Sequence, residues 1–65
     1  MRKIEFYVPE KIMADFAEEL SSSMLPNRIM GKTDDNKIII EVKYEKDESE
    51  MVDGMEDYLD ELINQ

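Results

Sequence analysis

The sequence predicts a small α+β fold in which a three-stranded antiparallel sheet is covered on one face by two helices. Residues 2–8 and 37–44 alternate between apolar and polar side chains, which is typical of half-buried strands. Residues 10–24 and 50–63 instead carry apolar side chains at helical spacing. With a shorter strand over residues 28–33 and polar turns between the segments, the element order is β-α-β-β-α.

The first strand is expected over residues 2–8, with Ile4, Phe6 and Val8 on one face and Lys3, Glu5 and Tyr7 on the other. Pro9 ends this strand because proline has no N–H group to donate to a neighbouring strand. A helix should follow from Glu10 to about Met24, with an apolar side made of Ile12, Met13, Phe16, Ala17, Leu20 and Met24. Pro26 ends the helix because it disfavours helical backbone in the residue before it.

Two further strands around one polar turn predict a β-hairpin. The first, residues 28–33, is short, and Gly31 within it suggests a bulge. Residues 33–36 should form the turn, because Asp and Asn tolerate a positive φ angle. The last strand, residues 37–44, is the most apolar, with Ile38, Ile40, Val42 and Tyr44 on one face and Ile39, Glu41 and Lys43 on the other.

The second helix is expected from about Glu50 to Ile63, after a loop over residues 46–49. Asp47 or Ser49 is the predicted cap, and Glu50 stands at capping-box spacing from Asp47. The apolar stripe consists of Met51, Val52, Met55, Leu59, Leu62 and Ile63. The methionines near both helices and the short strand are expected to fill the core; they are Met13, Met24, Met30, Met51 and Met55.

A right-handed crossover between the first two strands, followed by the hairpin, gives the sheet order 1-3-2. This order of elements resembles a ferredoxin-like α/β plait that stops before its last strand, without any shared motif. The missing strand leaves the outer edge of the first strand open from Lys3 to Val8. Two chains pairing along this edge would form a six-stranded sheet with two-fold symmetry, and the edge also suits an extended segment of another protein. The alternative is an edge protected by Lys3, Glu5 and strand twist alone.

Length and composition restrict the classes of function. Sixty-five residues predict one domain over residues 1–65, with a thin core. Because the chain has no Cys and no His, it forms no disulfide or zinc-type site and has no His or Cys for catalysis. No apolar run approaches the roughly 20 residues of a membrane span, and the charged N-terminus does not suit a signal peptide. We therefore expect a cytoplasmic protein that is not an enzyme and has no cofactor or metal ion.

Acidic residues are concentrated in the last third of the chain. Nine of the 17 acids lie between Glu45 and Glu61 with one base, Lys46, so this third carries −8 of the net charge of −9. On the second helix, Asp53, Asp57 and Glu61 follow one another at intervals of four residues, as do Glu56 and Asp60. Each such like-charge pair should destabilise the helix by about 0.2–0.5 kcal/mol. The simpler interpretation is a solvated face; the other is a contact surface for a basic partner.

The sequence therefore favours a non-enzymatic interaction or regulatory protein that forms a homodimer or binds a protein partner, with a basic protein as one candidate. The candidate partner-binding residues are Lys3, Glu5 and Tyr7 on the first strand and Asp53, Glu56, Asp57, Asp60 and Glu61 on the second helix. The net charge argues against direct binding of nucleic acids or anionic membranes. The first alternative is an inhibitor that mimics nucleic acid and occupies a basic DNA- or RNA-handling protein; the second is weak binding of a small ligand or a cation.

Overall fold

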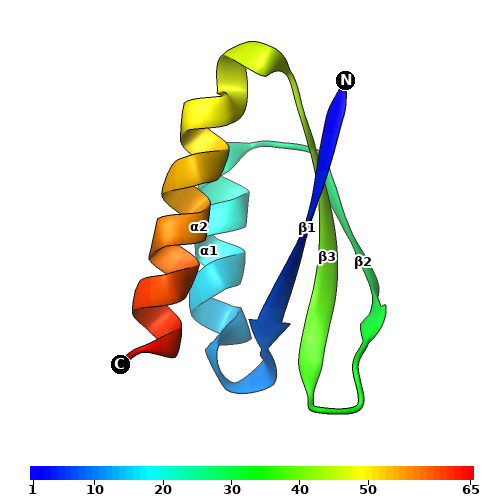
Figure 1. The fold of residues 1–65 in the computed structure, drawn as a ribbon, viewed down its shortest axis with the longest axis vertical. Coiled ribbons are helices and arrows are strands. Elements are labelled where there is room, and N and C mark those ends of the chain that lie inside the picture. Colours follow the sequence, from blue (N-terminus) through cyan, green and yellow to red (C-terminus); the bar gives the residue numbers. More distant parts are fainter.

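The computed structural model describes residues 1–65 and has the element order that the sequence predicts. The elements are β1 (Arg2–Pro9), α1 (Met13–Ser23), β2 (Asn27–Lys32), β3 (Lys37–Tyr44) and α2 (Ser49–Ile63), as Figure 1 shows. The strands form one antiparallel sheet in the order β1-β3-β2, so the most apolar strand lies in the centre. The predicted α+β fold and the predicted strand order are confirmed.

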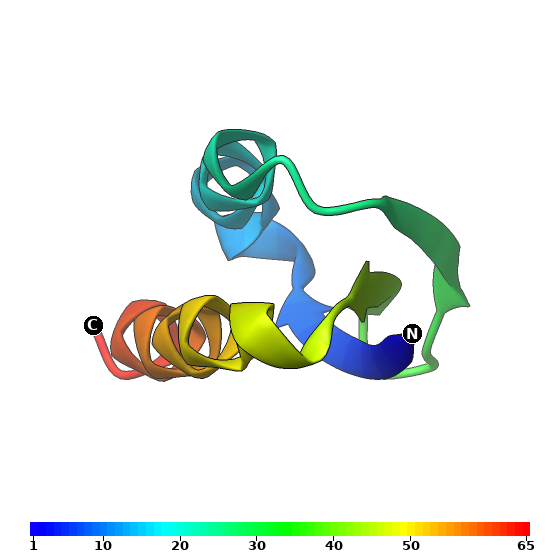
Figure 2. The same cartoon turned by 90° about the horizontal axis from the view of Figure 1, so that it is seen from above.

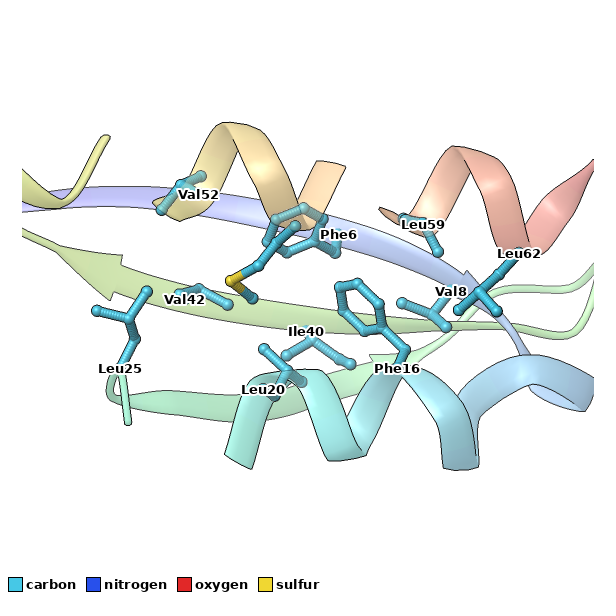
Figure 3. Close-up of a cluster of buried hydrophobic side chains, with 11 residues drawn as sticks. Phe6, Val8, Phe16, Leu20, Leu25, Ile40, Val42, Val52, Leu59 and Leu62 are labelled. Atoms are coloured by element: carbon cyan, nitrogen blue, oxygen red, sulfur yellow. The ribbon is translucent and has the colours of Figure 1, made fainter. Parts of the chain in front are cut away.

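Both helices lie on the same side of the sheet, as Figure 2 shows. This side carries the apolar residues that alternate along β1 and β3, while their polar neighbours point to the other side, which we call the open face. The core consists of Phe6, Val8, Phe16, Leu20, Leu25, Ile40, Val42, Val52, Met55, Leu59 and Leu62, shown in Figure 3. The rings of Phe6 and Phe16 join sheet and helix, with centroids 5.2 Å apart at an angle of 60°. Burying such a side chain contributes about 1.5–3 kcal/mol.

The hairpin between β2 and β3 contains both predicted irregularities. The register of β2 shifts between Ile29 and Gly31, which leaves Met30 as the extra residue of a β-bulge. Asn36 in the turn has a φ of 63°, the left-handed conformation that Asn tolerates. In the same turn the Thr33 hydroxyl donates a hydrogen bond to the carboxylate of Asp35 and lowers the pKa of that carboxyl group.

Both helices begin in a way that the sequence interpretation missed. Residues 10–12 form a 3-10 turn, η1 (Glu10–Ile12), so α1 starts at Met13 and not at Glu10. A second 3-10 turn, η2 (Lys46–Glu48), replaces the loop expected before α2. There the backbone N–H of Glu45 donates a hydrogen bond of 2.8 Å to the carboxylate of Glu48. The predicted capping box of Asp47 and Glu50 is wrong, because the 3-10 turn moves the first free N–H groups towards Glu45.

Three of the methionines are exposed, so the prediction that they fill the core is wrong for them. Met55 is buried and Met13 packs against the core, but Met24, Met30 and Met51 are exposed. Met30 occupies the bulge of β2, and Met24 ends α1 in a left-handed conformation with a φ of 59°. In that conformation the chain turns away from the helix, which leaves the Met24 side chain 87% exposed.

Replacing Met24 by Gly should stabilise the protein. A non-glycine residue in the left-handed region costs about 1–2 kcal/mol, and the exposed Met24 side chain contributes little packing. After allowance for the greater freedom of glycine in the unfolded chain, we expect Met24→Gly to raise the free energy of unfolding by about 1 kcal/mol in urea denaturation. Met24→Ala, which keeps the Cβ atom, should lack this gain. A loss of stability in Met24→Gly would contradict the backbone conformation described here.

Candidate interaction surfaces

The outer edge of β1 is eight residues long and has no neighbouring strand. No loop or side chain donates a hydrogen bond to the outward backbone groups of β1 or accepts one from them. The only hydrogen bond of a β1 side chain joins Tyr7 Oη to Glu5 Oε1 at 3.5 Å. An unpaired edge of this length is a template for another strand. Since β1 carries no bulge and its one proline is its last residue, little in its backbone opposes such pairing.

Like charges face one another across the open face of the sheet. The register of β1 and β3 sets Lys3 opposite Lys43 and Glu5 opposite Glu41, and next to them Tyr7 lies opposite Ile39. Directly opposed side chains of like charge destabilise a sheet, by roughly 0.2–1 kcal/mol for each pair. Across β1 and β3, the open face thus has one positive row, one negative row and one largely apolar row, and the like-charge pairs of the two charged rows weaken the isolated fold.

Glu41 is the most unusual residue of the open face, because it is 8% exposed although no helix covers it. Its nearest cationic atom is Nε of Arg28 on β2, 3.5 Å from Oε1, and Oε1 accepts no hydrogen bond. On its other side, in β1, lies Glu5. The carboxylate of Glu41 therefore has one opposite charge, Arg28, and one like charge, Glu5, as neighbours. Its negative charge is only partly compensated.

The acidic residues of α2 point to solvent. All five candidate residues of this helix, Asp53, Glu56, Asp57, Asp60 and Glu61, are exposed. The three ion pairs of the structure are Arg28–Glu41, Lys32–Glu10 and Lys37–Asp35, so none of the α2 carboxylates is compensated. α2 packs against β1 and α1, and Figure 2 shows it beside the β1 edge of the sheet. The acidic helix and the open strand edge thus lie on the same side of the molecule.

The eight candidate residues do not form one continuous patch. Lys3, Glu5 and Tyr7 project from the open face, whereas the five acids lie on the helix side of the sheet. The backbone edge of β1 separates the two groups. A strand added to this edge would therefore contact the β1 side chains on one face and lie next to α2 on the other.

Tyr58 lies on the flank of α2 that faces α1. Partial burial raises the pKa of its phenol, and the negative charges of Asp15, Glu19, Glu18 and Glu61 raise the pKa further. The space between the two helices is therefore negative as well, and it is lined by Glu18, Glu19, Ser21, Ser22 and Tyr58.

The acidic side chains nowhere gather into a metal site, since no three of them are placed to share one ion. Neither α1 nor α2 combines the length and the apolar character that crossing a membrane requires. Comparisons with models of protein families, with curated proteins and with solved structures give no match to this chain.

Sequence interpretation missed the opposed like charges and the buried position of Glu41. Both depend on the strand register, which pairs Glu5 with Glu41 and Arg28 with Glu41. Alternation along each strand gives the face of a residue but not its partner across the sheet. Both strands carry charged residues at alternate positions, Lys3 and Glu5 on one and Glu41 and Lys43 on the other. This alternation is the sequence signal that could have indicated like charges opposite each other.

The raised pKa of Tyr58 predicts a loss of stability at alkaline pH. Because the folded state disfavours the phenolate, the stability contributed by Tyr58 is complete below the ordinary pKa of 10.0 and decreases as the pH rises above it. In Tyr58→Phe, the urea midpoint should fall less between about pH 9 and about pH 11 than in the wild type. Equal losses in both proteins would show that neither the burial of Tyr58 nor the nearby carboxylates raise the pKa of its phenol.

Proposed function

We propose that this protein is a non-enzymatic interaction protein that self-associates through the outer edge of β1. The observation that carries the proposal is the eight-residue edge without any hydrogen-bond partner. Antiparallel pairing of two such edges gives a six-stranded sheet with a two-fold axis, and it satisfies the free backbone groups of both copies. For a domain of this size, association is one way to compensate for a thin core.

The side chains of β1 select one register for this pairing. When Ile4 lies opposite Ile4 of the second copy, Lys3 of each copy lies opposite Glu5 of the other. Both residues project from the open face, so two pairs of opposite charge form at the junction. Glu5 of the second copy thus continues the positive row of Lys3 and Lys43. In the same way, Lys3 of the second copy continues the negative row of Glu5 and Glu41. The charge pattern that weakens the isolated sheet, Lys3–Lys43 and Glu5–Glu41, is thus compensated by a second copy.

Pairing at the β1 edge also brings the α2 helices of both copies to the junction. The carboxylates Asp53, Glu56, Asp57, Asp60 and Glu61 of two chains would then form one extended acidic surface. Repulsion between the two helices opposes association, while a basic protein bound across both would relieve this repulsion. We therefore propose a basic protein as the partner of the dimer.

The second candidate function is mimicry of nucleic acid. It is supported by the absence of any ion pair on α2, since uncompensated carboxylates at helical spacing resemble a row of phosphates. In this case the partner is a protein whose basic groove binds DNA or RNA.

Exchange of the charges on β1 tests self-association. Glu5→Lys places a lysine opposite Glu41 within the chain but opposite Lys3 of the second copy. It should therefore raise the stability of the monomer by about 0.5 kcal/mol and weaken dimerisation about tenfold. Lys3→Glu should do the same through Lys43 and Glu5. The double exchange, Lys3→Glu with Glu5→Lys, should restore a dimer of twice the 7.7 kDa chain mass in light scattering.

The double exchange also controls for general effects of charge, because it has the composition of the wild type. A wild-type protein that stays monomeric at all concentrations would refute self-association through this edge. If the single variants Glu5→Lys and Lys3→Glu dimerise as well as the wild type, the proposed register is refuted.

Reversal of the acids on α2 tests the basic partner. Replacing Asp53, Asp57 and Glu61 by Lys should abolish capture of basic proteins from a cell extract, and capture by the wild type should weaken steeply as salt rises above about 0.1 M. Replacing Asp15, Glu18 and Glu19 of α1 by Lys is the matched control and should preserve capture. If DNA or RNA displaces the captured proteins, mimicry of nucleic acid is favoured. If the α2 reversal leaves capture unchanged, both the binding of a basic partner by α2 and the mimicry of nucleic acid are refuted.

A further inference from the structure

The two flanks of α2 have different neighbours. The side of the helix that faces the core carries the buried residues Val52, Met55, Leu59 and Leu62. Tyr58 lies on the flank towards α1, because it lines the same space as Glu18 and Glu19 of that helix. Glu61 follows Tyr58 by three residues and so lies on the same flank, where its negative charge acts on the phenol. One flank of α2 is thus assigned to α1.

The other flank of α2 faces outward past the edge of β1. Each residue of a helix is turned by about 100° from the one before it. Tyr58 precedes the buried Leu59, whereas Glu56 and Asp60 each follow a buried residue and therefore lie on the opposite flank from Tyr58. α2 packs against α1 and β1, and Figure 2 shows it at the β1 edge of the sheet. With α1 on one side, the flank of Glu56 and Asp60 is turned towards the place of a second copy.

Of these two acids, Glu56 lies closer to the two-fold axis of the proposed dimer. In the register proposed above, this axis passes beside Ile4, which pairs with Val42 of β3 within the chain. Val52 and Val42 lie at the same level along the sheet in Figure 3. Glu56 follows Val52 by about one helical turn, or about 6 Å, and Asp60 lies one further turn away.

Nothing in the chain compensates the charge of Glu56. Its side chain is exposed and takes part in none of the three ion pairs. In the dimer, the second copy brings the same flank of its own α2 to the axis, and this helix has no Lys or Arg to offer. Like charges repel over a range of about 10 Å at an ionic strength of about 0.1 M. The same geometry that pairs the two β1 edges therefore brings two uncompensated carboxylates together.

We propose that Glu56 limits self-association at the β1 edge through its repulsion from Glu56 of the second copy. This inference rests on the proposed dimer and assigns one residue to its regulation. A basic partner that neutralises Glu56 in both copies removes the repulsion, so binding of the partner and dimerisation strengthen each other. Asp57, on the side of α2 opposite to the core, stays available for the partner in the monomer and in the dimer.

Neutralisation of single acids tests this assignment. Glu56→Gln keeps the shape of the side chain, and it should lower the dissociation constant of the dimer about fivefold in sedimentation equilibrium. Glu61→Gln is the matched control, because it makes the same change on the flank that faces α1, and it should alter the constant by less than about twofold. Each glutamate stands four residues from an aspartate, Asp60 or Asp57, so both variants relieve one like-charge pair within the helix. Circular dichroism establishes that both variants are folded.

The response to salt is the second measurement. Raising sodium chloride from about 0.05 M to about 0.5 M screens the repulsion between the copies. The dimers of the wild type and of Glu61→Gln should therefore become tighter, and the dimer of Glu56→Gln should gain less. Equal dissociation constants and equal salt responses in the two variants would overturn the proposal.

The outcomes separate this inference from the proposed self-association. Adding Lys3→Glu to Glu56→Gln should weaken the dimer about tenfold, because the dimer of this variant still uses the β1 edge. If dimers respond to Lys3→Glu but not to Glu56→Gln, the role of Glu56 is refuted and self-association at β1 stands. If neither the wild type nor Glu56→Gln dimerises at any salt concentration, both are refuted.

Discussion

The structure depends on one constraint: a sheet of only three strands, with β3 in the middle, has two open edges, and its two helices do not cover all three strands. β3 pairs on both sides and supplies Ile40 and Val42 to the core, while β1 and β2 each keep one unpaired edge. α2 lies at the β1 edge and α1 leaves β2 uncovered, so the two edges differ in their surroundings. The edge of β1 is regular and lies beside an acidic helix, whereas that of β2 is bulged and borders an apolar groove between α1 and β2, lined in part by Ala17. The proposed association surface at the β1 edge follows from this arrangement.

Several features of the chain oppose its own stability. Lys3 and Lys43 face each other, as do Glu5 and Glu41, and α2 carries repeated acids without a compensating base. Glu41 is buried with an oxygen that accepts no hydrogen bond. Local conflicts of this kind are more common at functional surfaces than elsewhere, because selection for stability alone removes them. Their position on α2 and on β1 together with its neighbour β3 is the physical argument for an interaction at the β1 edge.

Most of the fold could be predicted from local patterns, but the surfaces could be predicted only in part. Alternation along β1 and β3 gave the correct core faces, and Gly31 and Asn36 marked the bulge and the left-handed turn residue. The same patterns failed where tertiary placement decides exposure. Met24 and Met30 were predicted to fill the core, yet the left-handed end of α1 and the bulge of the uncovered β2 expose them. The burial of Glu41 and the groove at Ala17 depend on strand register and helix position, which periodicity does not contain.

Amide hydrogen exchange along β1 at increasing protein concentration tests the central claim most directly. In an antiparallel ladder, alternate amides of an edge strand point inward and outward. The inward amides of β1 should be protected at every concentration by their bonds to β3. The account predicts that the outward amides between Lys3 and Val8 gain protection as the concentration rises and the edge becomes paired. Outward amides that exchange rapidly at all concentrations, while the inward ones stay protected, would contradict it.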